Sequence, residues 1–118
     1  MTKEILEYVK EQTANLISAP SCSKEAKAAA ENWLNSVDTD AEKEATKAYL
    51  TELELDIMPV DGLITFAGSD AGKKVFGTAT AKKILLHAKE IKAAGAVYCD
   101  CQACAAAKAI LDKKQEIL

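Results

Sequence analysis

Four cysteines give this sequence its most specific chemistry, because three of them stand within six residues. Cys99, Cys101 and Cys104 form a CxCxxC pattern, and Cys22 lies far upstream. No apolar leader follows Met1, so we expect a cytoplasmic, reducing compartment. There, grouped cysteines are more often metal ligands or redox groups than structural disulfides. The pattern therefore predicts a thiolate site.

The choice of metal follows from ligand type and spacing. Thiolates suit Zn²⁺, Cu(I) and iron–sulfur clusters. The four cysteines together would complete the tetrahedral four-thiolate site that structural zinc prefers. The spacing matches neither the bacterial nor the plant-type iron–sulfur pattern. We therefore expect Zn²⁺, with Cu(I) second and an iron–sulfur cluster less favoured.

The start of the last helix should bring the three clustered thiols together. If Asp100 is the N-cap, Cys101 is the first helical residue and Cys104 lies one turn later on the same face. Cys99, in the preceding loop, can fold back toward them. A helix N-terminus favours negative charge, which stabilises the thiolate form that binds metal or attacks disulfides.

Cys22 is expected at the start of another helix, after Ser21 and near Lys24 and Lys27. Two helix starts would then supply four ligands to one structural ion that clamps the second helix to the last. His87, the one histidine, could replace Cys22 as the fourth ligand. Its place on an otherwise structural helix favours an ordinary structural histidine instead.

Two other readings stay open. Cys101 and Cys104 form a CxxC at a helix start, as in thiol–disulfide oxidoreductases, which makes a redox enzyme or sensor the main alternative. No strand precedes the motif, which disfavours the catalytic version. A metal-free scaffold is the third reading, because Cys22 and Cys104 can serve as small core residues. An enzyme is disfavoured overall, since no other catalytic set of residues emerges.

Three further patterns are assigned structural roles. Residues 68–74 are one residue short of a phosphate-binding loop and lack its Ser/Thr. Residues 38–40 lack the glycine and the later glutamate of a calcium loop. Glu52, Glu54 and Asp56 alternate around a helix, so we expect all three to be solvated.

Composition predicts an all-α fold. The chain has 118 residues, is 49% hydrophobic and only 5% aromatic, and is rich in alanine. This length fits one domain. We expect a single helical domain over residues 1–118, a small bundle of about five longer helices plus one or two short ones.

Local signals set the expected helix boundaries. Apolar periodicity predicts a first helix over residues 3–18, stopped before Pro20, and a second from about Ser23 to Ser36. Later starts and stops are expected at Thr39 with Glu42 (a capping box), Pro59, Asp61, Ser69 or Asp70, Gly77, Thr78 or Thr80, Gly95 and Asp100.

Charge and hydropathy exclude two classes of partner. All fifteen basic residues are lysine and the net charge is -3, which argues against nucleic-acid binding. No apolar stretch approaches the ~20 residues of a membrane span. We expect another protein as the partner; the sequence does not specify an oligomeric state.

Three segments together carry a resemblance. They are APSC at residues 19–22, DIMPVDGLI at 56–64 and YCDCQAC at 98–104. In these the chain resembles small, uncharacterised bacterial four-cysteine helical proteins, some of them labelled as heat-shock chaperones of the ninety-kilodalton class. That class needs a long α/β ATP-binding domain, which 118 mostly helical residues cannot contain. The resemblance carries over no activity and implies only that Cys22 and the triplet belong to one pattern. We expect the protein to act as a small interaction or stress-related module.

Overall fold

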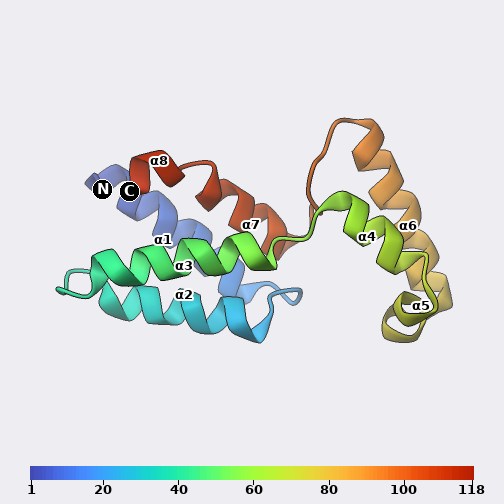
Figure 1. The fold of residues 1–118 in the computed structure, drawn as a ribbon, viewed down its shortest axis with the longest axis horizontal. Coiled ribbons are helices and arrows are strands. Elements are labelled where there is room, and N and C mark those ends of the chain that lie inside the picture. The colour runs from blue at the N-terminus through green and yellow to red at the C-terminus, as the bar shows by residue number, and fades with distance from the viewer. The chain divides into compact units, whose positions relative to one another are not determined.

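A computed structural model describes residues Met1–Leu118 and confirms the all-α class. It contains eight helices and no strand (Figure 1). Five helices are long, as expected, but three rather than one or two are short. They are α1 (Lys3–Ser18), α2 (Lys24–Ser36), α3 (Glu42–Asp56), α4 (Val60–Ala67), α5 (Asp70–Phe76), α6 (Thr78–Ala93), α7 (Gln102–Leu111) and α8 (Lys114–Ile117).

Most predicted boundaries are confirmed, because they rest on residues with strong local preferences. The Ser23 hydroxyl accepts from the Ala26 amide at the start of α2, and Ser69 caps α5 in the same way. Gly77 ends α5 with φ +83°, and Gly95 follows α6 with φ +103°. Both are left-handed conformations that favour glycine.

Two predicted caps outside the cysteine segment are wrong. Thr39 does not form a capping box: α3 begins at Glu42 with no side-chain cap. The Thr39 hydroxyl instead accepts from the Ala41 amide (3.2 Å) and donates to the Ser36 carbonyl (2.6 Å), so it stabilises the turn. Asp61 does not cap α4, because Pro59 occupies the N-cap position; it forms an exposed ion pair with Lys92.

The chain forms two compact units. Unit 1 consists of Met1–Ile57 and Asp100–Leu118, and unit 2 consists of Met58–Cys99. Unit 1 therefore holds α1, α2, α3, α7 and α8, and unit 2 holds α4, α5 and α6. The expectation of a single domain over residues 1–118 stays a prediction.

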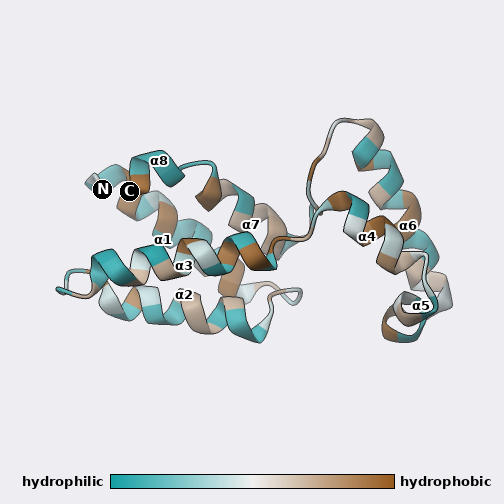
Figure 2. Ribbon diagram, in the orientation of Figure 1, coloured by the Kyte–Doolittle hydropathy of each residue, from teal (hydrophilic) through white to brown (hydrophobic).

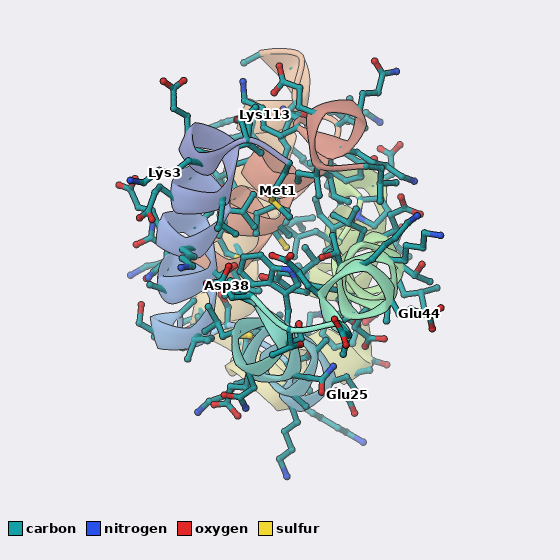
Figure 3. All side chains as sticks on the ribbon, turned by 90° about the vertical axis from the view of Figure 1, so that its left-hand side faces the viewer. Met1, Lys3, Glu25, Asp38, Glu44 and Lys113 are labelled. Atoms are coloured by element: carbon teal, nitrogen blue, oxygen red, sulfur yellow. The ribbon has the colours of Figure 1, made fainter.

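Unit 1 is organised around two aromatic side chains. Trp33 and Tyr49 are fully buried and stack with ring centroids 5.5 Å apart. Around them, α1 packs on α7 and α2 packs on α3, and apolar residues recur along each helix between polar ones (Figure 2). Charged side chains such as Lys3, Glu25 and Glu44 project from the outside of the unit (Figure 3).

The polar side chains next to Trp33 and Tyr49 are paired. The Thr13 and Tyr49 hydroxyls are hydrogen-bonded at 2.9 Å. Trp33 Nε1 donates to Thr46 Oγ1 at 2.9 Å, and the Thr46 hydroxyl donates to the Glu42 carbonyl at 2.7 Å. These bonds join α1 to α3 and α2 to α3, so they fix which faces of the helices meet.

Unit 2 has a smaller core. Val60, Leu63 and Ala88 are buried, and the partly buried residues packed against them include Ile91 and Cys99. Gly72 lies where α5 approaches the end of α4: a Cβ there would stand 1.9 Å from the Phe66 carbonyl oxygen. Only glycine fits this approach.

No helix of the structure combines the length and apolar character needed to cross a membrane.

We predict that Gly72→Ala destabilises unit 2 by about 3 kcal/mol, because the new methyl group overlaps backbone that cannot yield. Gly62→Ala is the matched control. Its Cβ would meet only the flexible Met58 Sδ at 3.4 Å, so it should stabilise α4 by about 0.5–1 kcal/mol. Hydrogen exchange of the α4–α6 amides measures both effects. Equal protection in the two variants would contradict the close approach.

Thr46→Val should lower the free energy of unfolding by about 1–3 kcal/mol, because it leaves the buried Trp33 donor without an acceptor. Thr46→Ser keeps the hydroxyl and should cost clearly less. Trp33 is the one tryptophan, so its fluorescence during urea unfolding reports the change directly. If the valine and serine variants are equally stable, the hydrogen bond contributes nothing.

Candidate metal centre

The N-cap of α7 lies one residue later than predicted. Asp100 is not the cap: Cys101 has extended backbone angles (φ -60°, ψ 161°), and Gln102 is the first helical residue. Cys101 Sγ accepts from the Cys104 amide at 3.4 Å, so a sulfur atom takes the place of the usual cap oxygen. Cys104 then lies three residues beyond Cys101, in the first turn of α7.

The convergence of the three clustered thiols is found in the structure. The Sγ atoms of Cys99, Cys101 and Cys104 all lie within 4.8 Å of one another. Cys104 is buried and the other two are half-buried. Tetrahedral Zn²⁺ ligation needs sulfur atoms about 3.8 Å apart, given Zn–S bonds of about 2.3 Å. Small side-chain adjustments would therefore suffice to close the three sulfurs on one ion.

Cys99 is positioned by its own backbone. Its amide donates to the Met58 carbonyl at 2.8 Å, beside an isolated bridge between Pro59 and Tyr98. The Val60 amide donates to the Val97 carbonyl at 2.8 Å. This pairing fixes the loop ahead of the CxCxxC segment in an extended conformation.

The first turn of α7 is tied to the end of α1 and the loop that follows it. Gln102 Nε2 donates to the Asn15 carbonyl at 3.1 Å and to Ser18 Oγ at 3.2 Å. The Ala103 amide donates to Ser21 Oγ at 3.4 Å. These contacts hold the α1–α2 loop, which carries Cys22, beside the start of α7.

Cys22 and Cys104 line one pocket of about 60 Å³ within unit 1. Cys22 is not part of the close group of three, so its role as fourth ligand stays a prediction. Its Sγ donates to the Ser23 carbonyl at 3.4 Å. Burial raises the pKa of the Cys22 thiol, the Asp56 carboxylate raises it further, and Lys27 opposes the rise.

Asp56 lines the same pocket, and the sequence did not single it out. The expectation that it is solvated is wrong: its Oδ2 atom is buried and has no hydrogen-bond partner. Burial raises the pKa of Asp56 to about 6, helped by a hydrogen bond with Glu52 and by the charges of Glu52 and Glu25. One signal was available, because Asp56 follows the buried Leu53 by three residues and so shares its helix face.

His87 lies exposed on α6 and is not a member of the close group. Its role as a replacement ligand stays a prediction. The close group can do two kinds of chemistry: three thiolates can hold a soft or borderline metal ion, and Cys101 and Cys104 can form a disulfide.

Comparison with protein-family models, with curated proteins and with solved structures finds no match to this chain. The function is therefore argued from the geometry of the site.

We predict that Asp56→Asn raises the melting temperature at pH 7.5 by about 2–5 °C, after allowance for solvent screening. The folded pKa of about 6 exceeds the ordinary value of about 3.9. The folded chain thus binds more protons between about pH 4 and pH 6 and loses stability as the pH rises through that window. Replacing the carboxylate removes this loss.

Thermal melts of the metal-free protein with chelator present, at pH 7.5 and pH 4, measure the difference between the variant and the parent. It should vanish near pH 4, where both side chains are neutral. Glu31→Gln, on the exposed side of α2, should show no comparable gain at pH 7.5. A gain for Asp56→Asn that is independent of pH would show that its cause is not the buried charge.

Proposed function

We propose that this protein binds one metal ion, Zn²⁺, through Cys99, Cys101 and Cys104, with Cys22 as the fourth ligand. The observation that carries the proposal is the approach of three Sγ atoms to within 4.8 Å of one another. Packing alone does not need three thiols gathered at the start of one helix. Cys22 is included because it shares a pocket with Cys104.

Zinc is preferred on chemical grounds. Thiolate ligation at this spacing suits tetrahedral Zn²⁺, with Cu(I) second and an iron–sulfur cluster third. Bound there, the ion would stabilise the first turn of α7, whose buried face packs on α1 and α3. The site is then structural, and its downstream role is recognition of a protein partner in the cytoplasm by a small interaction or stress-related module.

A thiol redox function is the second candidate. The Cys101 and Cys104 thiols are close enough for a modest movement to join them. Hydrogen peroxide would take two electrons and two protons from the two thiols, forming one S–S bond and two water molecules. Oxidation in this way would remove two ligands from the metal, so thiol titration before and after mild peroxide treatment distinguishes a stable metal site from a sensor.

We predict one equivalent of zinc per chain when the protein is purified without chelator, measured by elemental analysis. The Cys101→Ser/Cys104→Ser double variant should retain less than a tenth of an equivalent, because it lacks two of the close thiols. Ala105→Ser, an exposed position next to them on α7, is the control and should bind zinc as the parent does. Less than a tenth of an equivalent of any transition metal in the parent would reject the proposal.

A further inference from the structure

We propose that Asp56 supplies a carboxylate oxygen to this metal ion and competes with Cys22 for its fourth position. The site is then a mixed thiolate–carboxylate centre with an exchangeable ligand. This inference rests on the proposed metal-binding function, and it adds a residue that lies outside the cysteine pattern.

The pocket of unit 1 supplies the geometry. Cys22 from the α1–α2 loop, Asp56 from the last turn of α3 and Cys104 from the first turn of α7 all line it. Cys104 also belongs to the close group of three thiols. Of the three close thiols, only Cys104 lines this pocket, and neither Cys22 nor Asp56 belongs to the close group. Cys22 and Asp56 are therefore the donors that a side-chain movement across the pocket would bring to an ion on Cys104. The remaining lining is mainly apolar and includes Leu16, Leu53 and Ile57. The Asp56 carboxyl interacts with Glu52, but its Oδ2 atom is left without a partner.

The two potential ligands, Cys22 and Asp56, differ in their hydrogen bonding. Cys22 Sγ already donates to the Ser23 carbonyl. Asp56 Oδ2 is buried and has no partner. Buried polar atoms in folded proteins are nearly always satisfied, and each exception calls for an explanation. A cation in the pocket would satisfy this oxygen, and no rearrangement of the Cys22 hydrogen bond would be needed.

The chemistry of zinc allows the exchange. Zn²⁺ accepts thiolate and carboxylate ligands at similar distances, about 2.3 Å to sulfur and about 2.0–2.2 Å to oxygen, and it can expand to five-coordination. Two donors for one position make the fourth ligand replaceable. A site of this kind keeps most of its metal affinity when one of these two ligands is removed. A closed four-thiolate site loses much of its affinity when a ligand is removed.

A double-mutant cycle tests the competition. Zn²⁺ affinity is measured by competition with a chromogenic chelator for the parent, Cys22→Ser, Asp56→Asn and the combined variant, with Glu31→Gln as the control. Each single change should weaken binding by about tenfold or less, because the other donor substitutes. The combined change should weaken it by more than the product of the two single effects, since no donor remains.

Co²⁺ substitution and X-ray absorption give readouts that do not depend on stability. The thiolate-to-cobalt absorption should fall in Cys22→Ser and be kept or increased in Asp56→Asn. The zinc absorption spectrum of the parent should show an oxygen ligand beside the sulfurs, and Asp56→Asn should lose it. Circular dichroism confirms that each variant is folded.

The outcomes separate the two proposals. A parent that binds no metal rejects both. A parent that binds zinc through four sulfurs alone overturns the role of Asp56 and leaves the metal-binding function standing. The same conclusion follows if adding Asp56→Asn to Cys22→Ser does not change affinity. A combined loss larger than the product of the single losses supports the exchangeable ligand.

Discussion

The hydrogen bonds from the first turn of α7 to the end of α1 and the α1–α2 loop are the contacts on which the site depends. Gln102 and Ala103 reach residues more than eighty positions earlier in the chain, and they bring the two cysteine-bearing segments of unit 1 together. The same first turn holds Cys104 in the core. The same few residues therefore pack α7 on α1 and place the thiols.

Helix positions followed from the sequence wherever one residue type has a strong local preference. Pro20 stops a helix by restricting the residue before it, and Gly77 does so because glycine accepts the positive φ found there. Neighbours far away in the sequence therefore hardly matter. The N-cap residues were harder to predict than the helices, because a cap depends on the backbone angles of a single residue. At Cys101 the extended angles fall one position later than the aspartate that chemistry favours. The type of each helix was predictable, but the exact first residue was not.

The site shows the same division between local and long-range information. The approach of Cys99, Cys101 and Cys104 could be predicted, because six consecutive residues at a helix start leave few arrangements. For Asp56 the sequence carries two opposed signals: alternating charges on a helix normally point to solvent, whereas its spacing from Leu53 places it on the buried face. Periodicity within α3 indicates the face of Asp56, but the pocket that buries its oxygen is formed with the α1–α2 loop and α7, which are distant in the sequence.

A buried carboxylate oxygen without a hydrogen-bond partner lowers the stability of the fold. A purely structural bundle gains nothing from it. The aliphatic lining of the pocket would accept an apolar residue at this position and gain packing. Two thiols on the same pocket add groups that become anionic when they bind metal. Only a cation satisfies the carboxylate and the thiolates together. On the proposal of a bound ion, the stability lost in the metal-free chain would be recovered on binding, and folding of unit 1 would be thermodynamically linked to occupancy of the site.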